Sequence, residues 1–221
     1  MFYIVSTPIG NLKDITIRAL EVLKEVDLIA AEDTRQTRKL TQHYGINTPL
    51  TSYFEHNKVK KGDFLLSLLK QGQKIALVSD AGTPGISDPG YHIINLAIQN
   101  NIPITAIPGP TALITALSLS GMPTHKFIFE GFLSPKQAAR RKRLQELSGE
   151  QRTIILYESP HRIKKCLHDI SEILNDPLVV CARELTKKFE EIKREKASAL
   201  IEHFSKTLPR GEFVLILNLC P

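Results

Sequence analysis

Residues 79–90 read Ser-Asp-Ala-Gly-Thr-Pro-Gly-Ile-Ser-Asp-Pro-Gly, with three glycines and two prolines in twelve residues. They follow residues 75–78, Ile-Ala-Leu-Val, an apolar run without polar alternation, which is typical of a strand buried on both faces. A plain tight turn needs fewer residues, so we expect a rigid loop that brings backbone close to a ligand. Neither GxxxxGK[ST] nor GxGxxG occurs here, which argues against a nucleoside triphosphate or dinucleotide site.

Short apolar runs alternate with amphipathic stretches on both sides of this loop. The expected strands of this half are residues 2–5, 27–31, 74–78 and 103–107. This alternation predicts an α/β fold, with a mostly parallel sheet covered by helices in the N-terminal half.

A turn-rich stretch at residues 120–124 interrupts the pattern and predicts two α/β domains, residues 1–119 and 124–221. The second domain restarts with an apolar run at 127–129. Its expected helices are 135–147 and 160–174, and its further strands are 153–157, 178–182 and 212–217.

Two more Gly/Pro turns, residues 6–11 and 107–112, follow strands of the first half. Loops at the carboxyl edge of a parallel sheet converge on one crevice. The three loops together predict a pocket for a small ligand with amide and hydroxyl edges.

Charged residues also follow expected strands. Glu32, Asp33 and Arg35 group two carboxylates with a guanidinium, which suits acid and base chemistry, although Asp33 or Thr34 would equally cap the next helix. Two charged stretches of the second half also follow expected strands: residues 158–162 (Glu-Ser-Pro-His-Arg) and 183–188 (Arg-Glu-Leu-Thr-Lys-Lys). For His161, the sequence fits a solvated side chain as well as a catalytic one. No GxSxG elbow accompanies Ser159.

The chain carries 29 Lys and Arg against 23 Asp and Glu, a net charge of +6 that favours acidic partners. The densest positive run is Arg140, Arg141, Lys142 and Arg143. On a helix these side chains sweep most of the circumference, so they indicate either a solvated face or contact with RNA phosphates.

Three cysteines without a CxxC pair or a His cluster exclude a disulfide framework and a zinc site. The N-terminus lacks a signal-peptide pattern, and no apolar run approaches the length of a membrane helix. We expect a soluble, cytoplasmic protein without metal or membrane attachment.

The order of these motifs resembles the ribosomal RNA small subunit methyltransferase I family, within the tetrapyrrole methylase superfamily. The resemblance runs nearly end to end, and its most specific motifs are SDAGTPGISDPG and ESPHR. It also includes STPIGNL, AEDTR, PGPTA, FxGFL from Phe129 to Leu133, ARELTK and GEFVL.

The resemblance implies two α/β domains with S-adenosyl-L-methionine in the cleft between them, and a homodimer. It implies methyl transfer to a cytidine ribose 2′-hydroxyl in small-subunit ribosomal RNA. The alternatives are a superfamily relative that methylates a small tetrapyrrole or a protein side chain, and an RNA-binding module without catalysis.

Matched position by position, the resemblance assigns these residues to the cofactor: Pro8, Ala81, Gly82, Thr83, Ile86, Thr111, Ala112, Leu156, Tyr157 and Ala182. Thr83 departs from the Asp of relatives that methylate small molecules, so Asp80 is the expected contact to the cofactor's ribose. A carboxylate beside the substrate hydroxyl would assist its deprotonation, and Asp33 and Glu184 are the candidates. Arg35 and Arg162 are expected to position phosphate.

Overall fold

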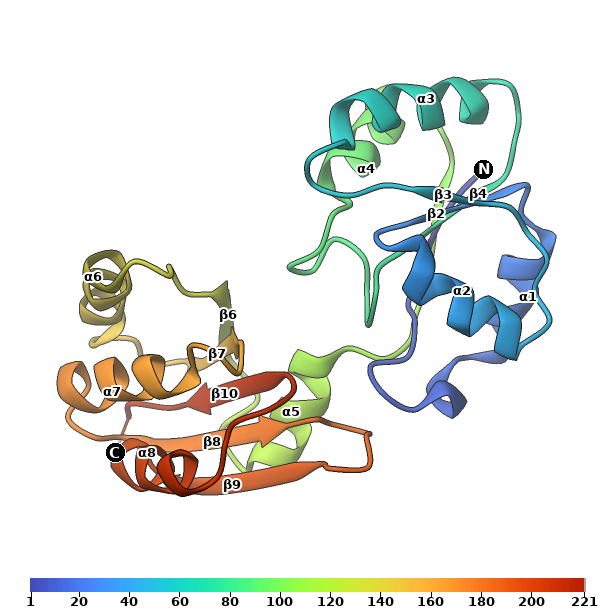
Figure 1. Ribbon diagram of the computed structural model, residues 1–221. Helices are drawn as coiled ribbons and strands as arrows, with labels where there is room; N and C mark the ends of the chain where they lie inside the picture. The colour runs from blue at the N-terminus through green and yellow to red at the C-terminus, as the bar shows by residue number, and fades with distance from the viewer. Residues whose placement is uncertain (221) are drawn as a thin grey trace. The chain divides into compact units, whose positions relative to one another are not determined.

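The computed structural model describes residues 1–220 and divides into two compact units, one from Met1 to Thr111 and one from Ala112 onward (Figure 1). Helix α5 (Ala112–Ser120) therefore belongs to the second unit, whereas the turn at 120–124 predicted a boundary after this helix. Its buried residues include Ala116 and Leu117, and the helix packs on strands of the second sheet.

The first unit is a parallel sheet of five strands in the order β3-β2-β4-β1-β5. The strands are β1 (Phe2–Val5), β2 (Leu28–Ala31), β3 (Leu50–Ser52), β4 (Ile75–Val78) and β5 (Ile104–Ile107). The sequence predicted four of them; the missed strand, β3, is short, only half-buried and at the edge of the sheet.

Helices cover both faces of this sheet. They are α1 (Ile17–Glu25), α2 (Thr34–His43), α3 (Lys58–Lys70) and α4 (Tyr91–Gln99), with the short 3-10 helix η1 (Leu12–Asp14) after β1. Along β4, Ala76 and Val78 pack with α1 and α2, while Ile75 and Leu77 pack with α3 and α4. This double coverage explains why β4 is apolar throughout.

The second unit is a mixed sheet of five strands in the order β6-β7-β10-β8-β9, with β6 and β7 parallel and the other neighbours antiparallel. The strands are β6 (Phe127–Phe132), β7 (Thr153–Glu158), β8 (Leu178–Arg183), β9 (Glu191–Lys196) and β10 (Phe213–Leu217). The α/β fold class and the parallel N-terminal sheet predicted from the sequence are confirmed.

Three helices pack in one apolar cluster with this second sheet: α6 (Gln137–Leu147), α7 (Ile163–Ile173) and α8 (Ala197–Lys206). The cluster contains the free thiols of Cys166 and Cys181, whose pKa values are raised by burial, so both are inert packing groups. Within residues 1–220, no helix has the length and apolar character needed to cross a membrane.

Candidate cofactor and substrate site

Three loops of the first unit meet at the carboxyl edge of its sheet. They follow the neighbouring strands β4, β1 and β5. The amide of Thr7 donates to the carbonyl of Gly82 at 2.8 Å, and the amide of Gly82 donates back to Thr7 at 3.0 Å. These two bonds form an isolated bridge that joins the first loop to the second.

Side-chain hydroxyl groups connect the third loop to the other two. Thr83 Oγ1 donates to the carbonyl of Pro110 at 3.3 Å and lies 2.9 Å from Ser6 Oγ. Since a hydroxyl has one proton, Ser6 is the donor in the second contact. Gly109 completes the junction, because a Cβ there would lie 2.9 Å from Ser6 Cβ. The convergence of these loops, expected from the sequence, is present in the fold.

The loop after β4 needs glycine at Gly82, where φ is +83°. A Cβ at this position would lie 3.5 Å from Ile9 Cγ2 and 3.8 Å from the carbonyl oxygen of Pro110. It would therefore fill the hollow between the three loops. Beside this junction, Thr7, Pro8 and Asp80 line a depression of about 170 Å³ together with residues of α2.

An acidic group stands at the same edge. The amide of Asp80 donates to Glu32 Oε2 at 3.3 Å, and the amide of Asp33 donates to Asp80 Oδ1 at 3.0 Å. Burial, followed by repulsion from Asp80 and Asp33, raises the pKa of Glu32 above its usual value. The sequence grouped Glu32 with Asp33, but only the structure distinguishes the two carboxyls.

Asp33 caps helix α2, as one of the two sequence-based readings expected. Its carboxylate accepts from the backbone amide of Arg35 at 2.8 Å and from the Arg35 side chain at 2.7 Å. The Arg35 side-chain hydrogen bond, with the backbone bond second, lowers the pKa of Asp33 to about 2. Arg35 itself is exposed and holds this carboxylate.

Of the four positions of the second unit assigned to the cofactor, Ala112 begins helix α5, and the other three lie on the two strands that flank β10. Tyr157 of β7 and Ala182 of β8 are both in register with Val214. The Tyr157 hydroxyl accepts from the amide of Leu113 at 3.1 Å, next to Ala112. Leu156 points the other way, into the apolar core of the unit.

A bulge in β6 places two phenylalanines beside Tyr157. Phe129 pairs with Ile155 and Phe132 with Tyr157, while the register shifts between Phe129 and Gly131, where φ is +63°. Phe129 and Phe132, three residues apart, therefore lie on the same face of the sheet, which a strand without a bulge does not allow. The rings of Phe129 and Phe132 lie 4.9 and 5.7 Å from that of Tyr157. Phe132, 54% exposed, is an aromatic group that the sequence analysis did not single out.

Arg162 is held by its own unit. It donates to the buried carboxylate of Glu158 at 2.7 and 2.8 Å and to the carbonyl of Leu133 at 3.2 Å, and its guanidinium lies 5.9 Å from the Phe132 ring. His161, next to it, is exposed. Arg162 thus orders the turn that carries His161, whereas its expected contact with phosphate stays a prediction.

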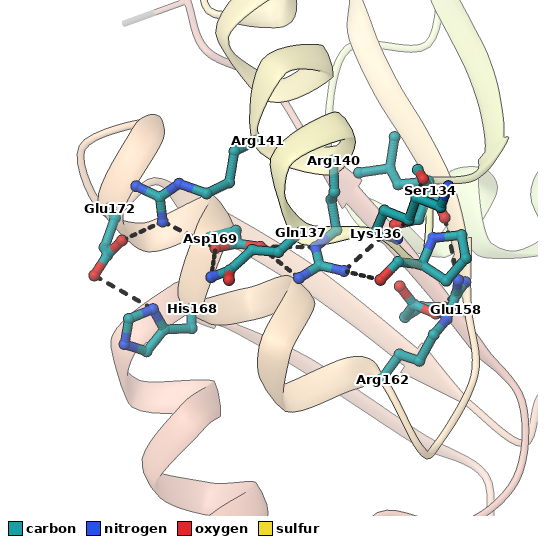
Figure 2. A network of polar contacts seen from close by, with 12 residues as sticks. Ser134, Lys136, Gln137, Arg140, Arg141, Glu158, Arg162, His168, Asp169 and Glu172 are labelled. Atoms are coloured by element: carbon teal, nitrogen blue, oxygen red, sulfur yellow. Dashed lines mark hydrogen bonds and ion pairs between the residues drawn. The ribbon is translucent and has the colours of Figure 1, made fainter.

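The arginines of helix α6 are engaged inside the second unit (Figure 2). Arg140 is 3% exposed and binds the buried Asp169 of α7 at 2.6 Å. Arg141 binds Asp169 at 3.0 Å and also binds Glu172. Outside the view, Arg143 is held by Glu130 at 2.7 Å and by Glu146 at 2.9 Å.

Within the basic run, Arg140 is removed from the surface, while Lys142 and Arg143 are exposed, so contact of the run with RNA phosphates stays a prediction. Arg140 is inaccessible and fastens α6 to α7, and its neighbouring arginines are neutralised. Among residues 1–220, Lys142 is the member of the run without a recorded partner. Burial raises the pKa of Asp169, but hydrogen bonds from Arg140 and Arg141 outweigh it, so the pKa lies below its usual value.

One grouping in this network has ligand spacing for a metal. Ligand atoms of His168, Asp169 and Glu172 lie within 4.8 Å of one another. Both carboxylates already bind arginine, so the group is explained by ion pairing.

Glu184 adopts the left-handed conformation, with φ +51°, directly after β8. Its carboxylate accepts from Lys187 at 2.8 Å and from the amide of Glu212 at 3.1 Å. Burial raises the pKa of Glu184, but these bonds outweigh it, and the pKa is lowered. Glu184 is thus paired with Lys187 inside the second unit, and its role in deprotonation stays a prediction.

The fold and these loops define a methyltransferase of the tetrapyrrole methylase type. A family model described as Tetrapyrrole (Corrin/Porphyrin) Methylases matches residues 1–201. Within it, the chain belongs to the ribosomal RNA small subunit methyltransferase I family.

Two relatives of that name are each 51% identical to this chain. The protein of Synechocystis sp. aligns over 218 residues, covering 98% of this chain and 78% of its own length. That of Thermotoga maritima aligns over 215 residues, covering 97% and 96%. The family resemblance read from the sequence is confirmed.

Solved structures at lower identity share the fold. A diphthine synthase superposes with a TM-score of 0.78 at 13% identity, covering 98% of this chain and 88% of that one. A cobalt precorrin-4 methyltransferase gives 0.73 at 18%, covering 100% and 96%.

S-adenosyl-L-methionine is the methyl donor of this family and the cofactor of this chain. The loops of the first unit fit it chemically. The space beside Gly82 is bounded by the Ile9 side chain and the Pro110 carbonyl, with the hydroxyls of Ser6 and Thr83 nearby, and this mix of apolar and polar groups suits adenine and ribose. Carboxylates at the same edge favour a cationic sulfonium.

The first prediction concerns the buried pair between Arg140 and Asp169. Asp169→Asn leaves Arg140 buried without a counter-ion, which costs about 3–5 kcal/mol in the free energy of unfolding. Urea unfolding at pH 7 measures this loss. Glu172→Gln, which touches only the outer end of the network, is the control and should leave the midpoint nearly unchanged.

The same pair has a pH signature. The folded-state pKa of Asp169 is lowered, so its contribution is complete above about pH 4 and is lost as the pH falls through the folded-state value. The wild type should therefore lose stability in acid more steeply than Asp169→Asn. If the wild type and Asp169→Asn have equal urea midpoints at pH 7, the pair does not stabilise the fold.

Proposed function

We propose that this protein transfers a methyl group from S-adenosyl-L-methionine to the ribose 2′-hydroxyl of a cytidine in small-subunit ribosomal RNA. The observation that carries the proposal is 51% identity, over nearly the whole chain, to proteins named ribosomal RNA small subunit methyltransferase I. The position of the hydroxyl and the identity of the base rest on the family resemblance alone. A homodimer in the cytoplasm is the accompanying expectation.

The first-unit residues proposed to hold the cofactor belong to the three joined loops. Gly82 with Ala81 would offer backbone, Asp80 a carboxylate for the ribose, and Pro8 with Ile86 apolar surface. Thr83 is committed to Pro110 and Ser6, which supports Asp80 as the ribose contact. Thr111 and the second-unit positions Ala112, Leu156, Tyr157 and Ala182 stay predictions.

When bound, the cofactor supplies an electrophilic methyl group on a sulfonium. The chain's own task is to orient the ribose oxygen in line with it, which contributes most of the rate in such a transfer. The proton that leaves the hydroxyl needs an acceptor. A general base works best with a pKa near the working pH, and by this criterion Glu32 is better suited than Asp33.

The second prediction tests the cofactor loop. Gly82→Val fills the hollow between the loops, so calorimetric binding of S-adenosyl-L-methionine should be lost. Gly72→Val is the matched control, because φ there is +87° and the surrounding space is open. The control should bind normally, and EDTA should change neither titration. If Gly82→Val binds the cofactor normally, the cofactor does not bind beside Gly82.

The third prediction tests the substrate. Purified protein with tritiated cofactor should label small-subunit ribosomal RNA transcribed without modifications, and digestion to nucleosides should release 2′-O-methylcytidine. Label in a base or in another ribose would refute the cytidine ribose assignment. Label in a tetrapyrrole or in ribosomal protein, with none in RNA, would favour the alternative class of substrate.

The fourth prediction compares carboxylates in single turnover with saturating RNA and cofactor. Removal of a general base slows transfer by about 10²–10⁴-fold. Because the pKa of Glu32 is raised, the rate loss of Glu32→Gln should fall in this range. The rate losses of Asp33→Asn and Glu184→Gln should be much smaller. A large loss in Asp33→Asn or Glu184→Gln would restore that residue as the base. Near-normal rates in all three would leave orientation as the main contribution.

A further inference from the structure

A groove in the second unit lies between two loops, residues 184–190 after β8 and residues 207–211 before β10. It has a volume of about 390 Å³. Its lining comprises Arg183, Glu184, Phe189, Thr207, Leu208 and Arg210. It shares no residue with the loops proposed for the cofactor.

Two large apolar side chains stand open to solvent here. Phe189 is 65% exposed and Leu208 is 71% exposed, although both belong to loops that pack on a well-formed core. An exposed ring and an exposed leucine beside a depression offer apolar contact area to a partner.

The loop that carries Phe189 is held in position. Glu184 and Thr186 are both in the left-handed region, with φ values of +51° and +65°. The amide of Thr186 donates to Glu190 at 2.6 Å, and Glu184 is held by Lys187 and Glu212. Gly211 of the neighbouring loop has φ +85°, and a Cβ there would lie 2.2 Å from the Glu184 carboxyl carbon, so a side chain would displace the Glu184 carboxylate. Phe189 is therefore presented by an ordered loop.

Charges of both signs surround the groove, and among its acids Glu190 has no cationic partner within residues 1–220 and accepts from the Thr186 amide. Lys187 is bound by Glu184 and Glu212, and Arg183 by Glu191. Lys188 lies 5.6 Å from the Phe189 ring centroid and, like Arg210, makes no ion pair within residues 1–220. Two cations without acidic partners thus flank an exposed ring. On helix α6, by contrast, the arginines are all neutralised.

We propose that this groove binds a single-stranded segment of the RNA substrate, with a base stacked on Phe189 and phosphates held by Lys188 and Arg210. The inference rests on the proposed function, which makes RNA the partner. Aromatic platforms between cations are how single strands are held without base-specific hydrogen bonds. The two cations without ion pairs, Lys188 and Arg210, favour a phosphate-bearing strand over a second copy of this chain, which would bring the same two cations to the contact.

The fifth prediction measures affinity for a single-stranded oligonucleotide of about 12 nucleotides, cut from the small-subunit ribosomal RNA sequence. Phe189→Ala should weaken binding by about 5- to 150-fold, the worth of one base stack. Lys188→Gln and Arg210→Gln should each lower the slope of log affinity against log salt by about 0.7. Calorimetric affinity for S-adenosyl-L-methionine should be unchanged in all three.

Two controls match these variants. Tyr91→Ala removes an aromatic ring that is 79% exposed in the first unit, and Lys142→Gln removes the unpaired lysine of α6. Both should bind the oligonucleotide as the wild type does. If Lys142→Gln lowers the salt slope while Lys188→Gln and Arg210→Gln do not, RNA binds along α6 and the inference fails.

The remaining outcomes separate this inference from the proposed function. If the wild type methylates ribosomal RNA and Phe189→Ala keeps full affinity, the groove is not the RNA site, and the proposed function stands. If Phe189→Ala instead dissociates a dimer in sedimentation with RNA affinity intact, the groove is a protein interface and the inference is overturned. A wild type that neither binds nor methylates RNA refutes the proposed function itself.

Discussion

The reciprocal backbone hydrogen bonds between Thr7 and Gly82 join the ends of two neighbouring parallel strands, and the candidate cofactor loops are arranged around them. Parallel strands place their carboxyl ends at one edge, but they do not by themselves bring the following loops into contact. That contact requires a left-handed residue at Gly82 and the absence of a side chain at Gly109, against Ser6. The glycines of these loops are thus needed for loop packing as well as for access to a ligand.

In the second unit, too, many charged side chains are placed by the requirements of packing. Burying Arg140 requires a buried acid, and Asp169 supplies it from the next helix. The outer arginines of α6 then share acids on α7, β6 and α6 itself, so the helix that contains most of the positive run contributes little field to its surroundings. Net charge therefore says less about a binding surface than the number of cations left without acids, and in the positive run of α6 that number is one, Lys142.

The fold is shared with proteins at 13–18% identity whose names refer to diphthine and to a cobalt precorrin. A fold that hosts such different names does not select a substrate by its topology. Selection must come from the loops and exposed side chains that differ between members. In this chain, the exposed Phe132 and Phe189 and the unpaired Lys188 and Arg210 are side chains that could take part in such selection, because none of them contributes to an apolar core cluster.

The sequence by itself determined the α/β class, the parallel first sheet, the buried strands and the loops at their carboxyl ends. These follow from hydrophobic period and from Gly and Pro, which act within a few residues. The tertiary structure decided what depends on distant partners: Arg140 meets an acid 29 residues away, and β9, a charged edge strand without apolar alternation, exists because β8 pairs with it. The bulge at Gly131 likewise turned Phe132 toward Tyr157, since one extra residue reverses the face of every side chain after it.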